Sequence, residues 1–320
     1  MIYLILFLIS FSLTYFIKNY MIKKSLVATV NERSSHTTPT PHGGGIALAI
    51  TWFIGLFYLY FIGEISSNLF YALLFGAVIS IVSFFDDIYE LSPKIRLIVQ
   101  AIVAIGGLYF LGGFETLTFG IFDIQNPIFT NIFAFFMIIW FINLYNFLDG
   151  INGYAGSEAV FLALAGFILF GGNHFLVLAM AVLGFLYWNW NKAKIFMGDV
   201  GSTLLGYNIA IFTIYYTNQE PTNFWLWIIL FSVYWFDATL TLIRRKLNKE
   251  KLSLAHKKHA YQRLTQAGWS HYKVTNYSIG LNILLLGIVY FLPNIFVEII
   301  VSLIVIIIVM KFIDNKKKFE

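Results

Sequence analysis

Residues 2–17 read IYLILFLISFSLTYFI, a stretch without a charged side chain. Similar stretches recur along the whole chain, and they approach or exceed the roughly 20 apolar residues that a helix needs to cross a bilayer. The chain is 59% hydrophobic and 12% charged, whereas soluble domains average about 25% charged residues. So few charges could not cover the surface of a soluble protein of this length. We therefore predict one all-α, polytopic membrane domain over residues 1–320.

The first apolar stretch also resembles a signal peptide, which carries its positive charge before the apolar core. Here the positive charges Lys18, Lys23 and Lys24 follow the core instead. We interpret the stretch as a retained first helix with its N-terminus outside. The chain has no cysteine, which excludes disulfides and thiolate metal sites.

The apolar stretches predict about eleven transmembrane helices. We place them at residues 2–20, 44–62, 68–85, 95–112, 130–147, 158–170, 174–190, 201–217, 223–243, 274–292 and 295–312.

Positive charge is confined to alternate loops. All 21 Lys and Arg residues lie in or beside the loops 21–43, 86–94, 148–157, 191–200, 244–273 and the C-terminal tail. The positive-inside rule assigns these loops to the cytoplasm. We therefore expect a periplasmic N-terminus and a cytoplasmic C-terminus. In the longest external loop, the alternating residues 115–124, ETLTFGIFDI, suggest a small periplasmic β-hairpin, although a plain loop explains them as well.

Two cytoplasmic segments are rich in glycine and precede apolar helices. Residues 31–47 read NERSSHTTPTPHGGGIA, where Gly43, Gly44 and Gly45 allow a close approach to a ligand or simply to another helix. Residues 192–206 read KAKIFMGDVGSTLLG. There Asp199 stands between glycines, where it suits a carboxylate that shares Mg²⁺ with substrate phosphates, a helix N-cap, or both.

Two further segments carry acids and amides. Residues 84–97 read FFDDIYELSPKIRL. The acids Asp86 and Asp87, with the bases Lys94 and Arg96, could hold a metal and a polyphosphate or could form an ordinary solvated loop. In residues 143–156, NLYNFLDGINGYAG, three polar residues share one helix face and one lies beyond a glycine. They are Asn143, Asn146, Asp149 and Asn152. Amides of this kind read a nucleobase or bind hard cations.

The last cytoplasmic segment, residues 244–264, reads RRKLNKEKLSLAHKKHAYQRL. Its basic residues, Arg263 among them, and its histidines His256 and His259 suit an anionic substrate, although part of the charge reflects topology and contact with anionic lipid. The two histidines do not suffice for a zinc site, because no third ligand lies near them in the sequence. Asp237 lies inside the ninth predicted helix, where it is either functional or part of a structural pair with Arg244 or Arg245.

Carboxylates, amides and a basic loop on one side of a membrane together predict metal-assisted phosphoryl chemistry at the membrane surface. A transporter of an anionic glycolipid or nucleotide is the rival hypothesis. It predicts polar residues near the bilayer midplane and repeat symmetry, whereas the polar residues gather at one face.

Five segments resemble, in order, the motifs of the polyprenyl-phosphate N-acetylhexosamine-1-phosphate transferases. They are RSSHTTPTPHGGG, FFDDIYELSPK, NLYNFLDGING, IFMGDVGS and AHKKHAYQRL. The resemblance covers nearly the whole chain. It implies a bacterial inner-membrane enzyme that transfers a sugar 1-phosphate, GlcNAc or a 6-deoxy-HexNAc, from a UDP-sugar to undecaprenyl phosphate. UMP is released, and an O-antigen-like surface glycan is initiated. Membrane lipids are further expected partners, nucleic acid is not, and a homodimer is left open.

The resemblance also implies roles for individual residues. Asp199 and Asn146 match residues that lie at a Mg²⁺ or Mn²⁺ ion. Asp86 and Asp87 match an acidic pair that helps to position or deprotonate the lipid phosphate. Lys94 matches a lysine that contacts phosphate. Asn143, Asp149 and Arg263 are expected among the substrate-binding residues. Asn152 matches a uracil-recognising position that is aspartate in many bacterial members. His256 and His259 match a loop over sugar and diphosphate, and the spelling HKKH argues against a MurNAc-pentapeptide donor.

Overall fold

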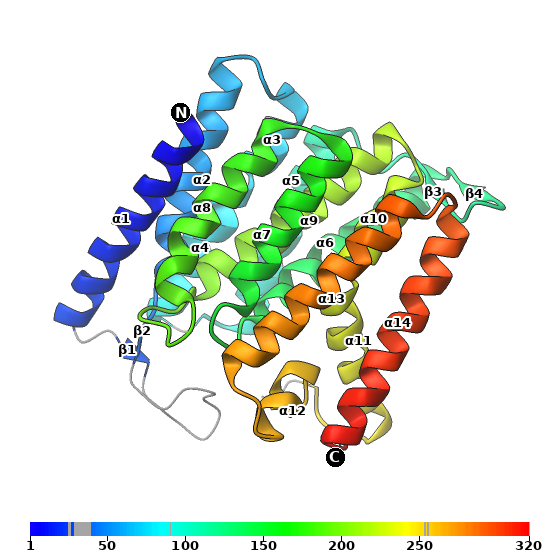
Figure 1. The fold of residues 1–320 in the computed structure, drawn as a ribbon. Coiled ribbons are helices and arrows are strands. Elements are labelled where there is room, and N and C mark those ends of the chain that lie inside the picture. The colour runs from blue at the N-terminus through cyan, green and yellow to red at the C-terminus, as the bar shows by residue number, and fades with distance from the viewer. Residues whose placement is uncertain (25–26, 29–39, 90, 253, 255, 320) are drawn as a thin grey trace.

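The computed structural model of the protein describes residues 1–24, 27–28, 40–89, 91–252, 254 and 256–319. Residues 31–39, which make up much of the first motif, lie outside these ranges. The described chain is a bundle of helices with two small β-ladders (Figure 1). The helices are α1 (Ile2–Lys23), α2 (Gly44–Phe61), α3 (Ser67–Leu74), α4 (Gly76–Tyr89), α5 (Pro93–Leu111), α6 (Pro127–Leu148), α7 (Tyr154–Phe170), α8 (Asn173–Asn189), α9 (Asp199–Gln219), α10 (Asn223–Leu230), α11 (Ser232–Leu247), α12 (Ala260–Gln266), α13 (His271–Phe291) and α14 (Ile295–Lys316).

Among the described residues, seven helical segments are long and apolar enough to cross a membrane, and α3 with α4 counts as one of them. An eighth is the pair α10–α11, which is bent by 73°. The protein is therefore an all-α, multi-pass membrane protein, as predicted. Each of the eleven predicted segments overlaps a helix or a helix pair, but α7 and α8 are short and α9 is less apolar. The number of crossings stays a prediction.

Helix α9 is less apolar because it is enclosed by other helices. It packs against α2, α4, α6, α7 and α10, among others. Asn208, Thr213 and Thr217 are buried along it, and both threonine hydroxyls donate to the backbone carbonyl four residues earlier. A helix in this position need not present an apolar surface to lipid. Its first residue, Asp199, is thereby fixed at one end of the bundle.

Two β-ladders lie at opposite ends of the bundle. β1 (Val27–Ala28) pairs with β2 (Thr40–Pro41) just before α2, and β3 (Leu117–Thr118) pairs with β4 (Asp123–Ile124). The β3–β4 ladder falls within residues 115–124, where alternation suggested a hairpin. Figure 1 shows α12 and the C-terminus at the end of the bundle opposite to β3–β4.

Candidate active site

Backbone contacts join the first and fourth motifs. The N–H groups of Gly44 and Gly45, at the start of α2, donate to the carbonyls of Phe196 and Met197, at 2.9 and 2.8 Å. A Cβ atom on Gly45 would lie 2.3 Å from the backbone nitrogen of Gly201. The glycines therefore serve the close packing of α2 on the N-terminus of α9, one of the two interpretations that the sequence left open.

An acidic corner forms where α4, α6 and α9 meet. Gly198 adopts a φ of 76°, which favours glycine, and turns the chain into α9 so that Asp199 is its first residue. The Asn146 side-chain amide donates to Asp199 Oδ1 at 2.8 Å, and the Asp199 N–H donates to Asp87 Oδ1 at 3.4 Å. Three residues predicted from separate motifs are thus brought into direct contact.

The adjacent acids of the second motif point in different directions. Asp86 accepts a hydrogen bond from the Leu91 N–H at 2.7 Å and forms an ion pair with Arg96 at 2.8 Å. Asp86 and Asn143 line a small neighbouring cavity that Asn146 and Asp199 also line, and Asn143 exchanges hydrogen bonds with the Gln100 side chain. Of the two acids, Asp87 lines a cavity of about 290 Å³ together with Asp199, whereas Asp86 supports the turn between α4 and α5.

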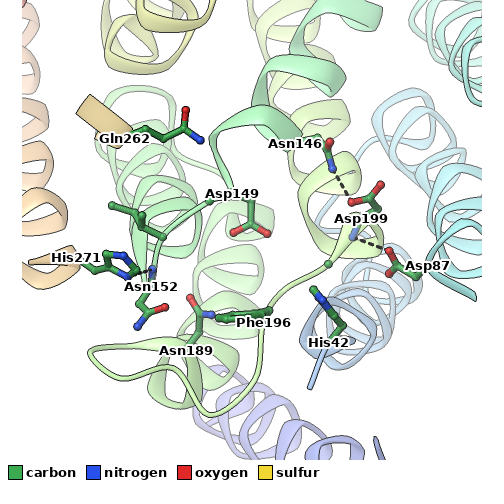
Figure 2. Close-up of a pocket in the computed structure, with 13 residues that line it drawn as sticks. His42, Asp87, Asn146, Asp149, Asn152, Asn189, Phe196, Asp199, Gln262 and His271 are labelled. Atoms are coloured by element: carbon green, nitrogen blue, oxygen red, sulfur yellow. Dashed lines mark hydrogen bonds between the residues drawn. The ribbon is translucent and has the colours of Figure 1, made fainter. Parts of the chain in front are cut away.

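The main cavity has a volume of about 290 Å³ and opens to the surface. Figure 2 shows Asp149 between the acidic corner and a second group of amide, imidazole and phenyl side chains. The lining residues are His42, Asp87, Asn146, Asp149, Gly150, Ile151, Asn152, Asn189, Phe196, Gly198, Asp199, Gln262 and His271. Five predicted site residues, Asp87, Asn146, Asp149, Asn152 and Asp199, are therefore assembled in one place.

Five lining residues were not singled out from the sequence: His42, Asn189, Phe196, Gln262 and His271. Asn189 is buried; its side chain accepts from the Gly153 N–H and donates to the Ile195 carbonyl, both at 2.9 Å. His271 accepts from the Asn152 N–H at 3.5 Å. A usable signal was present, because all five are polar or aromatic residues within or beside the predicted cytoplasmic loops.

Of the segment 244–264, Gln262 lines the cavity, whereas His256 and His259 do not. His259 is buried at the start of α12, 3.7 Å from Asp237, and its ring centre is 4.9 Å from that of His256. Partial burial and the neighbouring His259 lower the pKa of His256 to about 4. His256 is therefore neutral near pH 7, so it adds no positive charge for an anionic substrate.

Two other predicted substrate contacts also lie away from the cavity wall. Lys94 is exposed in the first turn of α5. Arg263 is 2% exposed and donates to Asp314 and to the Lys317 carbonyl, at 2.6 and 3.0 Å. In this geometry Arg263 links α12 to α14.

The expected partners of Asp237 were wrong. Arg244 binds Asp314, and Arg245 binds Glu250. Asp237 instead accepts the Ala260 N–H on both carboxylate oxygens, at 2.8 and 2.9 Å. The short sequence separation between Asp237 and these arginines was misleading, because in the folded protein the first backbone N–H of α12 binds the Asp237 carboxylate.

Three carboxyl groups, those of Asp87, Asp149 and Asp199, line the cavity. Removal from water, together with the charges of Asp199 and Asp87, raises the pKa of Asp149 to about 7. Among the described residues, no group of three or more acidic or histidine side chains is arranged to hold a metal alone. Two carboxylates and an amide fit Mg²⁺ nonetheless, because proteins bind it through one or two carboxylates plus substrate phosphates.

Comparison with known proteins identifies the family. Residues 69–217 match glycosyl transferase family 4. The chain is 32% identical, over 81% of its length and 75% of the relative's, to a probable undecaprenyl-phosphate N-acetylglucosaminyl 1-phosphate transferase of Bacillus subtilis. The protein belongs to the polyprenyl-phosphate N-acetylhexosamine-1-phosphate transferases. It is therefore an enzyme, a phosphotransferase.

Other relatives of this transferase carry two kinds of name. An undecaprenyl-phosphate alpha-N-acetylglucosaminyl 1-phosphate transferase of Thermotoga maritima is 26% identical over 79% of the chain and 78% of its own length. A phospho-N-acetylmuramoyl-pentapeptide-transferase of Streptococcus mutans is 30% identical over 88% and 97%. The matched family region includes the acidic corner, Asp149 and Asn152, but ends before α12.

Proposed function

We propose that this transferase moves an N-acetylhexosamine 1-phosphate from a UDP-sugar to undecaprenyl phosphate and releases UMP. An oxygen of the lipid phosphate forms a bond to the β-phosphorus of the UDP-sugar. The bond between that phosphorus and the bridging oxygen breaks, and the oxygen leaves with UMP. The observation that carries the proposal is the single cavity in which Asp87, Asn146 and Asp199 face Asn152 and Asn189 across Asp149.

The two sides of the cavity suit the two ends of a nucleotide sugar. The amide side chains of Asn152 and Asn189 stand with the Phe196 ring on one side (Figure 2). Amides match the donor and acceptor edges of a nucleobase, and an aromatic ring offers a stacking surface. The acidic corner on the other side repels a diphosphate unless a cation intervenes. A nucleoside diphosphate therefore fits only in one direction.

Mg²⁺ or Mn²⁺ is part of the proposal. Asp199 and Asp87 would hold it, with Asn146 beside them. A divalent ion at this corner supplies charge neutralisation for two phosphorylated substrates. Asn146 fixes the Asp199 carboxylate through its 2.8 Å hydrogen bond, and the positive φ of Gly198 sets the direction in which the chain enters α9.

An apolar cavity of about 640 Å³ suits the polyprenyl chain. It lies between α6, α10 and α11, beside β3, and its lining includes Met137, Trp140 and Phe141 of α6. The same helix carries Asn146 five residues after Phe141, which is about 7.5 Å along a helix that rises 1.5 Å per residue. At about 100° per residue, Asn146 lies about 140° around α6 from Phe141, so a lipid chain in this cavity would reach the acidic corner by passing around α6.

The side of the membrane follows from charge. The cavity lies at the end of the bundle that carries α12 and the basic segments, which the positive-inside rule places in the cytoplasm. A UDP-sugar made in the cytosol and a lipid phosphate held at the inner membrane of a bacterium meet at that face. The buried Asp237 caps α12 at this end of the bundle.

The proposed sugar is GlcNAc or a 6-deoxy-HexNAc. The proposed lipid-linked product initiates the synthesis of an O-antigen-like surface glycan. The experiment is a membrane assay with undecaprenyl phosphate, Mg²⁺ and a panel of UDP-HexNAc donors, including UDP-MurNAc-pentapeptide. UMP release with a UDP-HexNAc and none with the pentapeptide donor is expected. Absence of release with every donor contradicts the proposal.

A further inference from the structure

Helix α12 contributes to the cavity but is too short to hold its own position. It has seven residues, Ala260–Gln266, and isolated helices below about 12 residues are marginal in water. Gln262 on this helix lines the cavity. Tyr261, the residue before Gln262, donates to the Phe147 carbonyl at 3.1 Å, in the last turn of α6 and two residues before Asp149. The placement of Gln262 therefore depends on what holds α12 from outside.

The C-terminal end of α14 makes such a contact. Asp314 accepts two hydrogen bonds from the Arg244 guanidinium, at 2.9 and 2.8 Å, and one from Arg263 at 2.6 Å. Arg244 belongs to α11 and Arg263 to α12, so one carboxylate joins three helices. Arg263 also donates to the Lys317 carbonyl at 3.0 Å.

Phe319 closes this contact. Its ring centre lies 5.3 Å from the Arg244 guanidinium, 5.5 Å from the Lys258 ammonium and 5.5 Å from the Arg263 guanidinium. Lys258 belongs to the segment 244–264 and is paired with Glu250 at 2.8 Å. Cations over an aromatic face attract it by about 0.5–2 kcal/mol each. The end of α14 therefore contacts both α12 and the segment that precedes it.

Arg263 is the residue directly after Gln262, so its position limits where Gln262 can lie. We propose that Asp314 is a positioning residue: through Arg263 it fixes α12, so that Gln262 meets the donor substrate in the cavity. The choice of a UDP-sugar as that donor rests on the proposed function. The contact through which Asp314 joins α11, α12 and α14 does not depend on the proposed function.

The test compares Asp314→Asn and Asp314→Glu with the wild-type protein in bilayer discs, with Lys311→Gln as a control that removes an exposed charge one turn earlier on α14. We expect Asp314→Asn to raise the donor KM about tenfold while kcat changes less than about threefold, because the contact it weakens serves donor binding. Asp314→Glu, which keeps the charge, should restore KM to within about threefold of wild type, and Lys311→Gln should match wild type. A donor KM within twofold of wild type in Asp314→Asn overturns the proposal.

A double-mutant cycle separates positioning from direct binding. Arg263→Gln should raise the donor KM as much as Asp314→Asn does, and the double variant should add little, because the two side chains act as a unit. An Arg263→Gln effect far larger than that of Asp314→Asn would mean that Arg263 binds substrate itself, and it overturns the proposal.

A second readout needs no donor. Trypsin cleavage within residues 249–258 of the full-length protein should be faster in Asp314→Asn and return to the wild-type rate in Asp314→Glu. Unchanged cleavage overturns the proposal. If the wild-type protein uses no donor, the proposed function fails, and this arm still decides whether Asp314 holds the segment.

Discussion

Gly45→Ala is the substitution whose effect follows most directly from the geometry. Gly45 lies in the first turn of α2, where its N–H donates to the Met197 carbonyl. An added Cβ would lie 2.3 Å from the Gly201 nitrogen, 2.6 Å from the Gly201 Cα and 2.9 Å from the Met197 carbonyl oxygen. All three are backbone atoms, so no side-chain rotation can relieve the contact.

The size of the effect can be worked from these distances. Ordinary van der Waals contact begins at 3.4 Å, so α2 and the start of α9 must separate by about 1 Å. Asp199 lies two residues before Gly201 and moves with it. A 1 Å misplacement of a reacting group costs on the order of 10²-fold in rate, and overpacking of this kind costs about 1–3 kcal/mol of stability. We therefore expect kcat/KM to fall about 100-fold.

The assay is sugar 1-phosphate transfer to undecaprenyl phosphate, with a thermal unfolding curve for each variant. Gly280→Ala and Gly287→Ala in α13 are matched controls, because nothing lies within 4 Å of a Cβ at either position. They should keep full activity and gain about 0.5–1 kcal/mol of stability. Gly45→Ala activity within threefold of wild type, or an equal loss in the controls, refutes the reasoning.

Three further predictions concern a helix cap, a titrating acid and the apolar cavity. Asp237→Asn weakens the cap on α12 and should cost about 1–3 kcal/mol in thermal unfolding; an unchanged melting temperature contradicts this role. Because the pKa of Asp149 is raised to about 7, a cation that binds nearby must displace its proton at lower pH. Mg²⁺ affinity, measured by calorimetry, should therefore fall below about pH 7, and Asp149→Asn should make that slope shallower; an unchanged slope in the variant excludes Asp149 as a contributor. Met137→Gln places an amide in the apolar cavity and should raise the KM for the polyprenyl phosphate roughly tenfold without changing the donor KM; equal changes in both place the lipid elsewhere.

The helices and the acids of the cavity could be predicted because each is strongly constrained in a membrane. A helix that crosses a bilayer needs a long apolar stretch, and a carboxylate at its boundary needs a reason. Asp87, Asp149 and Asp199 were found in this way, and Asn146 by its place on the same helix face as Asp149. The contact between α2 and α9 was also accessible, since three consecutive glycines indicate a close approach.

Other features depend on tertiary packing. Asp86 and Asp87 point in different directions because consecutive helix residues lie about 100° apart, but which of the two meets Asp199 depends on how α4 packs against α9. Helix α12 is too short and polar to produce an apolar period. The partner of Arg244 is Asp314, on a helix far along the chain, whereas proximity in sequence pointed to Asp237.

The central claim is that a phosphoryl group, and not the sugar alone, moves to the lipid at the acidic corner. The most direct test supplies a UDP-HexNAc carrying ³²P in its β-phosphate to the purified protein with undecaprenyl phosphate and Mg²⁺. We expect the label to enter the lipid extract, unlabelled UMP to be released, and Asp199→Ala to abolish both. Label that stays in the nucleotide as UDP, or full activity in Asp199→Ala, would contradict it.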